Sequence, residues 1–99
     1  MPPPNSFNMY VTVDEEGSDA VLEVYLAGDR GPLNKATVEY ELFTGQGVPL
    51  GIVGEMKRIA SGVWCSPPLP LAENMGEVCA LVQANPQGYP LKRKDTISR

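Results

Sequence analysis

Residues 35–43 read Lys-Ala-Thr-Val-Glu-Tyr-Glu-Leu-Phe and carry the clearest structural signal in this chain of 99 residues. The even-numbered residues from 36 to 42 are apolar or aromatic, whereas Thr37, Glu39 and Glu41 between them are polar. A period of two is typical of a β-strand that packs one face against a core and turns the other to solvent. We therefore expect a strand over 35–43 that turns its even-numbered side chains towards the core.

Other short strands extend this pattern along the chain. Gly and Pro together make up 20 of the 99 residues, and they fall mainly between the apolar runs, as in a turn-rich β protein. The first two expected strands form a hairpin, and the prolines after residue 65 end the fifth or push it to a sheet edge. The expected strands are 7–13, 20–27, 35–43, an edge strand with a bulge within 50–60, one that begins at 63–65, 77–84, and 89–97. The sequence predicts an all-β, antiparallel two-sheet β-sandwich of about seven strands.

The length of the chain favours a single domain. Residues 1–6, Met-Pro-Pro-Pro-Asn-Ser, contain three consecutive prolines, which favour an extended arm and exclude helix. We expect 1–6 to be a proline-rich lead-in and 7–99 to be one β-sandwich domain.

Three segments together resemble a bacterial immunoglobulin-like β-sandwich domain. They are 36–44 (Ala-Thr-Val-Glu-Tyr-Glu-Leu-Phe-Thr), 62–64 (Gly-Val-Trp) and 76–84 (Gly-Glu-Val-Cys-Ala-Leu-Val-Gln-Ala). The general layout is similar to that of periplasmic YtkA-like and FixH-like domains, over about residues 8–97. The link of those domains with copper implies soft or imidazole ligands. This chain has no histidine, so no functional residue is carried over.

Composition limits the chemistry that the chain can perform. The absence of histidine removes the usual general base and the commonest metal ligand. The net charge is −4, and half of the eight basic residues lie in the last eight positions, unlike the basic face of a nucleic-acid binder. We expect no catalytic activity, no cofactor, no metal site, no nucleic-acid partner and no membrane insertion. The chain shows no signal peptide, which predicts a cytoplasmic protein if Met1 is the native start and an exported one if the chain is an excised mature domain.

Cys65 and Cys79 are the first candidate site. They fall in successive expected strands, where a disulfide would close a loop of about 15 residues. The alternatives are two buried thiols that act as small apolar side chains, or a small metal or redox site. The spacing is not C-x-x-C, which gives a redox or zinc site little support.

Aromatic side chains are the second candidate site. Tyr10 and Tyr25 fall on the non-core parity of the first two strands and mark a candidate contact surface, whereas Trp64 is either the core tryptophan or part of a platform for sugar rings. We expect a non-catalytic interaction or accessory module that binds another protein or self-associates, through the Tyr10–Tyr25 face or an exposed edge near 50–60. The alternatives are a glycan partner, as in a carbohydrate-binding module of an exported protein, or a small metal or redox protein that uses Cys65 and Cys79.

Overall fold

The computed structural model describes residues 6–13, 19–28, 31–71, 76–88 and 90–98. The lead-in expected over 1–6 lies outside these residues except for Ser6, which already belongs to the first strand. Within the described ranges, no helix has the length and apolar character needed to cross a membrane.

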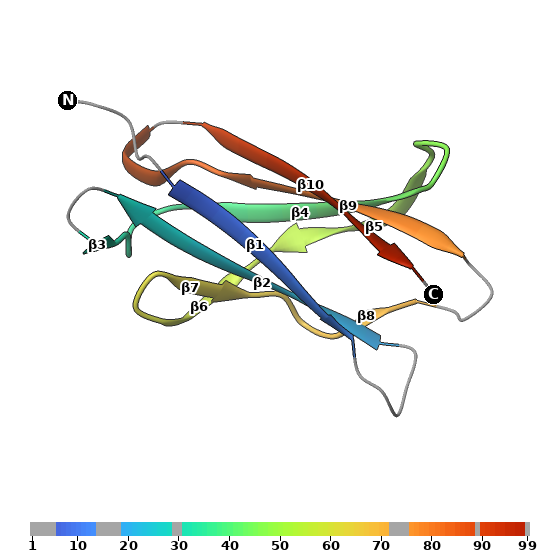
Figure 1. Cartoon of the computed structure of the whole chain (residues 1–99), viewed down its shortest axis with the longest axis horizontal. Helices are drawn as coiled ribbons and strands as arrows, with labels where there is room; N and C mark the ends of the chain where they lie inside the picture. Colours follow the sequence, from blue (N-terminus) through green and yellow to red (C-terminus); the bar gives the residue numbers. More distant parts are fainter. Residues whose placement is uncertain (1–5, 14–18, 29–30, 72–75, 89, 99) are drawn as a thin grey trace.

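The described residues form two antiparallel sheets (Figure 1). Their strands are β1 (Ser6–Val13), β2 (Asp19–Gly28), β3 (Gly31–Pro32), β4 (Val38–Thr44), β5 (Pro49–Glu55), β6 (Lys57–Ala60), β7 (Val63–Cys65), β8 (Leu69–Pro70), β9 (Glu77–Ala84) and β10 (Leu91–Ser98), with a short 3₁₀ turn, η2 (Pro86–Gly88), before β10. The first sheet has the order β1-β2-β7-β6, and β3 and β8 also pair with β2. The second sheet has the order β10-β9-β4-β5. The prediction of an all-β, two-sheet sandwich is confirmed.

Three of the expected strands differ from the structure. The strand expected over 35–43 begins only at Val38, and the last strand begins at Leu91, directly after Pro90, which has no N–H to donate to a ladder. The single strand expected within 50–60 is two strands, and they lie at the edges of different sheets. The chain changes sheet at Met56, whose side chain is buried and whose N–H donates to the Val38 carbonyl at 2.7 Å. The expected edge position and the expected irregularity are confirmed, because the β4–β5 and β6–β7 registers both shift.

The core lies between the two sheets, on the alternating inner positions of the longer strands. In β2, residues 20, 22, 24 and 26 have no exposed surface, and β9 buries every second residue in the same way. The buried apolar residues are Ala20, Leu22, Val24, Leu26, Val38, Tyr40, Leu42, Met56, Trp64, Leu69, Leu71, Val78, Ala80, Val82, Ala84 and Ile97. The period of two seen in the sequence therefore places one face of each long strand in the core.

Ser66 completes the ladder of β2 where two prolines interrupt its neighbour. Because Pro67 and Pro68 have no N–H, they cannot donate to β2. Ser66 donates its N–H to the Leu22 carbonyl at 2.9 Å, and its Oγ accepts the Leu22 N–H at 2.9 Å. The hydroxyl donates in turn to the Pro67 carbonyl at 2.9 Å. Among the residues whose exposure the structure describes, Ser66 is the buried polar one. Its side chain thus satisfies a buried backbone group of the central strand.

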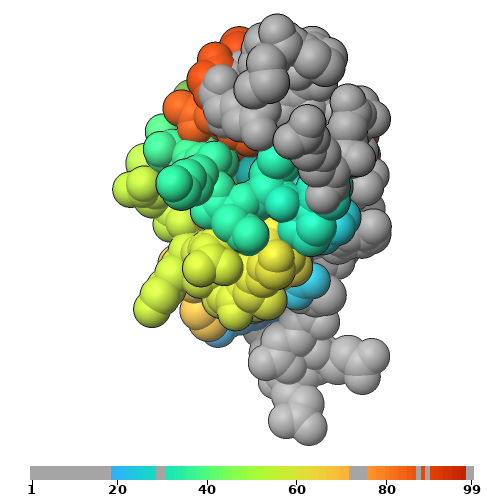
Figure 2. Space-filling model, turned by 90° about the vertical axis from the view of Figure 1, so that its left-hand side faces the viewer, coloured from blue at the N-terminus to red at the C-terminus, as the bar shows by residue number. Residues whose placement is uncertain are grey.

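Gly62 allows a close approach at the end of the sandwich shown in Figure 2, where residues 31–37 lie beside the turn between β6 and β7. Its φ is +73°, and a Cβ there would lie 2.8 Å from Pro32 Cβ and 2.9 Å from the Leu26 carbonyl oxygen. The Gly62 carbonyl accepts the Leu26 N–H at 2.8 Å, and its N–H donates to Asn34 Oδ1 at 2.6 Å. A residue without a side chain therefore ties the β6–β7 turn to β2.

We predict that Ser66→Ala lowers the free energy of unfolding by about 1–3 kcal/mol, because it leaves the buried Leu22 N–H without an acceptor. The control is Ser61→Ala, since Ser61 is exposed and its hydroxyl accepts only a long hydrogen bond, of 3.3 Å, from the Asn34 side chain. The free energy of unfolding of this control should change by no more than about 0.5 kcal/mol. Urea denaturation followed by tryptophan fluorescence measures both. Equal effects of the two substitutions would contradict the assigned role of Ser66.

We also predict that Gly62→Ala destabilises the domain more than Gly47→Ala. Both glycines have positive φ, so both substitutions carry the backbone strain of about 1–2 kcal/mol. Nothing lies within 4 Å of a Cβ at Gly47, whereas Gly62 meets Pro32 and Leu26. The overlap should add about 1–3 kcal/mol to the loss at Gly62, and a pair of equal losses in the same denaturation assay would disprove this contact.

Candidate functional site

The candidate site is the side of the second sheet that faces away from the core, which we call the outer face. Its residues alternate with the buried residues of β4 and β9 and occupy matching positions on β5 and β10. Cross-strand pairing arranges them in three rows that run from β10 through β9 and β4 to β5. The rows are Lys92–Gln83–Glu39–Glu55, Lys94–Leu81–Glu41–Val53 and Thr96–Cys79–Phe43–Pro49.

Charge is separated along these rows. Both lysines lie on β10, and the three glutamates lie on β4 and β5. Strands in a sheet are about 4.8 Å apart, so Lys92 lies about 10 Å from Glu39 across the sheet. That separation is about one Debye length at physiological salt, where exposed charges are largely screened. The β5 side of the outer face is therefore acidic, and the β10 side is basic.

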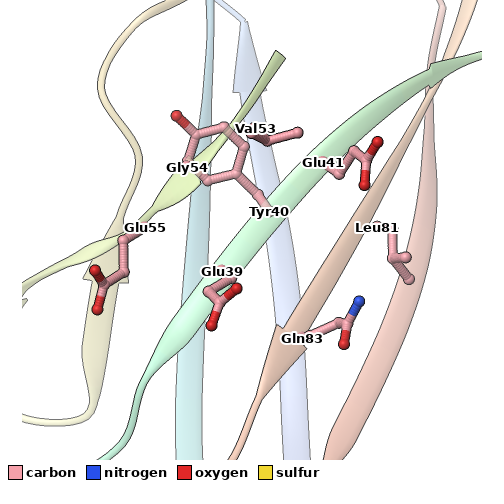
Figure 3. A pocket seen from close by; sticks show the side chains of 8 residues that line it. All are labelled: Glu39, Tyr40, Glu41, Val53, Gly54, Glu55, Leu81 and Gln83. Carbon is pink, nitrogen blue, oxygen red and sulfur yellow. The ribbon is translucent and has the colours of Figure 1, made fainter. Parts of the chain in front are cut away.

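A shallow hollow of about 490 Å³ lies on the acidic side (Figure 3). Glu39 and Glu55 are exposed, Glu41 and Leu81 are half-buried, and Val53 is 60% exposed. The lining residues are Glu39, Tyr40, Glu41, Val53, Gly54, Glu55, Leu81 and Gln83. The lining of the hollow thus combines carboxylates with the apolar side chains of Val53 and Leu81.

A second hollow, of about 370 Å³, adjoins the first at Leu81. Phe43 and Cys79 form its apolar part, and Lys94 contributes its positive charge. The glycine-containing turn between β4 and β5 supplies the rest of its lining. Leu81 is therefore the apolar centre of a face that carries opposite charges on its two sides.

Tyr40 links the core to β5. Its ring belongs to the buried core, yet its hydroxyl would lie 2.6 Å from a Cβ at Gly54, so a side chain at that position of the edge strand would displace the Tyr40 hydroxyl. Only 7% of Tyr40 is exposed, it lines the 490 Å³ hollow, and its hydroxyl has no hydrogen-bond partner among the described residues. Figure 3 shows the hydroxyl end of the ring beside Gly54 on β5. A hydrogen-bonding group of the core thus reaches the edge of the sheet.

Large apolar side chains are exposed along the same edge. Among the residues whose exposure the structure describes, they are Val48 at 57%, Val53 at 60% and Ile59 at 58%. All three lie within 48–60, the segment that supplies one of the two edge strands of each sheet. This is the edge near 50–60 that the sequence singled out.

The two cysteines do not form a pair. Both thiols are free, and both side chains are half-buried rather than buried. Cys65 follows the buried Trp64 in β7 and pairs with Glu23 on the first sheet, whereas Cys79 pairs with Phe43 on the second. The two residues thus lie on the outward positions of opposite sheets, whose backbones pack about 10 Å apart. The structure therefore does not bring the two cysteines together, because sequence spacing does not tell which sheet a strand joins.

The environment of Cys65 disfavours its thiolate. Burial raises the pKa of the Cys65 thiol, and the negative charge of Glu23 beside it raises that pKa further. Reactive cysteines have the opposite surroundings, with a lowered pKa. Within the described residues, no group of three acidic or cysteine side chains is arranged to hold a metal ion.

The aromatic residues occupy separate places. Trp64 is 3% exposed and belongs to the core, so its indole offers no surface for stacking a sugar ring. Tyr25 is half-buried, and its Cε1 atom would lie 3.1 Å from a Cβ at Gly62, which shows that the ring packs over the β6–β7 turn. Tyr10 lies opposite Glu23 in the β1–β2 register, but its side chain falls outside what the structure describes.

No motif in the sequence singles out the outer face. Glu39 and Glu41 were expected to face solvent, and they do. The pairing of Glu39 with Glu55, and the position of Leu81 between Glu41 and Lys94, depend on strand register. The only sequence signal for the face is the odd-numbered parity of 39–43 and 79–83.

We predict that alkylation labels two thiols in the denatured protein without any reductant. In the native Cys79→Ser variant, Cys65 should react more slowly at pH 8 than in the Cys79→Ser/Glu23→Gln variant, because removal of the carboxylate lowers the pKa of the thiol and raises its thiolate fraction. Intact-mass spectrometry over time measures both rates. A mass that corresponds to a bridged protein, or equal rates in the two variants, would contradict these assignments.

Comparisons with known proteins assign no family to this architecture. No family model matches the chain, and no match is found among curated proteins or among solved structures. What is established is a small all-β domain of two antiparallel sheets.

Proposed function

We propose that this domain is a non-catalytic interaction module that binds another protein through the edge formed by residues 48–60. The observation that carries the proposal is that Val48, Val53 and Ile59, the exposed large apolar side chains among the residues whose exposure the structure describes, all lie on this one segment. Val48 and Val53 lie beside and on β5, and Ile59 lies on β6, so each sheet has an edge strand with an exposed apolar side chain that an incoming chain can contact.

The backbone of the same edge supports the proposal. β5 pairs with β4 on one side, and no other described strand pairs with it on the other. An edge strand offers unpaired N–H and C=O groups to an incoming strand. A partner that adds a strand there gains main-chain hydrogen bonds, and apolar contact with Val53 adds to them.

The chemistry of the described side chains favours binding over catalysis. The chain has no histidine to act as a general base, and the cysteine with a perturbed pKa is shifted away from reactivity. The larger hollow is shallow and charged, unlike the largely apolar cavities that enclose small ligands. We infer that the outer face and its edge make contacts rather than perform a reaction.

We further infer that the sandwich is of the immunoglobulin-like type. The order β1-β2-β7-β6 corresponds to strands A-B-E-D of that fold, and β10-β9-β4-β5 corresponds to G-F-C-C′. The chain departs from antibody domains in having its buried tryptophan, Trp64, in the strand that corresponds to E rather than C. On this assignment β5 is strand C′, the edge of the sheet that bears the outer face.

The proposal predicts that peptides selected from a random twelve-residue library on the immobilised domain bind at the 48–60 edge. Val53→Thr and Ile59→Thr keep β-branched shape and should cost little stability at exposed positions. Loss of one apolar contact should weaken the peptides by about fourfold in at least one of these variants, at about 0.8 kcal/mol per apolar group. Fluorescence anisotropy with labelled peptides measures this loss.

The matched control for this test is Thr96→Ser, which lies on β10 at the far side of the outer face. It should leave the affinity of the selected peptides unchanged. Failure to select any peptide, or selected peptides whose affinity is insensitive to both Val53→Thr and Ile59→Thr, would overturn the proposed function.

A further inference from the structure

We propose that the partner at the β5 edge is an extended strand of another protein that carries a basic residue two positions from an apolar residue, the basic one beside Glu55 and the apolar one beside Val53. This inference rests on the proposed function and specifies its ligand. It follows from the row structure of the outer face, from an unfavourable charge pair within it and from the hydroxyl of Tyr40.

The charge pair is Glu39 with Glu55. These residues are direct cross-strand partners in the β4–β5 register. Neither carboxylate has an ion pair or side-chain hydrogen bond with another described residue. Like charges directly opposite each other destabilise a sheet. A cation that arrives next to Glu55 would extend the row Gln83–Glu39–Glu55 and relieve this repulsion.

Beside the neighbouring row, which contains Val53, the partner strand should carry an apolar side chain. Val53 pairs with Glu41 and lies two residues from Glu55, so it occupies the same face of β5. Its exposed surface lines the same hollow as Leu81, with Glu41 between them in the row. A partner strand in register with β5 would therefore place an apolar residue beside Val53 and, two positions away, a basic residue beside Glu55. That spacing holds for either strand direction.

The hydroxyl of Tyr40 marks the position between these two rows. Gly54 separates Val53 from Glu55 and leaves room for the Tyr40 ring, whose hydroxyl is the unpartnered polar group of an otherwise buried side chain. A strand that pairs with β5 would bring its own backbone or a small polar side chain next to this hydroxyl. We expect Thr or Ser at the position between the apolar and the basic residue.

A second copy of this chain fits the edge less well. Pairing β5 with the β5 of another copy would bring the acidic sides of two outer faces together. The other edge of the same sheet, β10, places Arg93 and Asp95 opposite the buried residues Val82 and Ala80. Charged residues at inward positions protect an edge strand from pairing. A basic partner strand is therefore the occupant that the charges favour.

The test uses two synthetic peptides with capped ends. The first is Thr-Val-Thr-Lys-Thr-Val-Thr-Lys-Thr, which offers the same alternation in both directions, and the second has Glu in place of both Lys. We expect the lysine peptide to bind the full chain at least tenfold more tightly, with an affinity that falls as salt is raised. Its amide shifts in ¹⁵N-labelled protein should fall on β4 and β5 and not on β10.

Glu55→Gln separates this account from a purely structural role of the carboxylate. The substitution removes the like-charge pair with Glu39, so it should raise the urea midpoint of the free domain, and it should weaken the lysine peptide at least fivefold. The control is Glu77→Gln, an exposed carboxylate at the start of β9 outside the hollow. It should change neither quantity.

Equal binding of the two peptides, no binding of either, or shifts that map to β10 would overturn the inference. So would concentration-dependent dimerisation of the free chain that Glu55→Gln enhances, because it would identify a second copy as the occupant. The proposed function has a separate test in the peptide library. Library peptides that depend on Val53 but carry no basic residue would leave that function in place and remove only this inference.

Discussion

The hydrogen bonding of β2 along both edges is the constraint on which the rest of the sandwich depends. One edge is paired over its length by β1, whereas the other is shared among β8, β7 and β3. No single strand could cover that second edge, because prolines at 67, 68 and 70 interrupt the chain beside it. Ser66 and the β6–β7 turn at Gly62 supply the missing bonds, to Leu22 and Leu26. β2 can therefore bury its inner side chains without leaving buried backbone groups unpaired.

The path of the chain also determines which side of the sandwich carries the edge strands β5 and β6. The chain leaves the second sheet after β5 and continues as β6, an edge strand of the first sheet. Between the two strands, the side chain of Met56 is buried in the core. The same side of the sandwich thus carries one edge strand of each sheet, β5 and β6. The exposed apolar side chains, the cross-strand pair of Glu39 with Glu55 and the Tyr40 hydroxyl all lie on this side. These features are the basis of the proposed contact with another chain.

The strands were predictable where alternation and turn residues agree. The strand at 77–84 was expected with its observed bounds, since it alternates between a glycine turn and an Asn-Pro turn. Over 50–60 the two glycines weaken the pattern, and the apolar residues occupy both parities, so the change of sheet at Met56 leaves no mark in the sequence. The separation of Cys65 from Cys79 could not be predicted for a related reason, because spacing along the chain does not show which sheet a strand joins. The outer face could not be predicted because Glu39 and Glu55 become partners only through the register of β4 with β5.

Residue-resolved amide hydrogen exchange tests the central role of β2 most directly. If β2 holds the sandwich together, the amides of Leu22 and Leu26 should exchange only by global unfolding, with a protection free energy equal to that from urea denaturation. The β5 amides that are not bonded to β4 should exchange through local opening and be far less protected. The account would be contradicted if Leu22 and Leu26 exchanged as fast as the β5 edge, because β2 would then open without unfolding the domain.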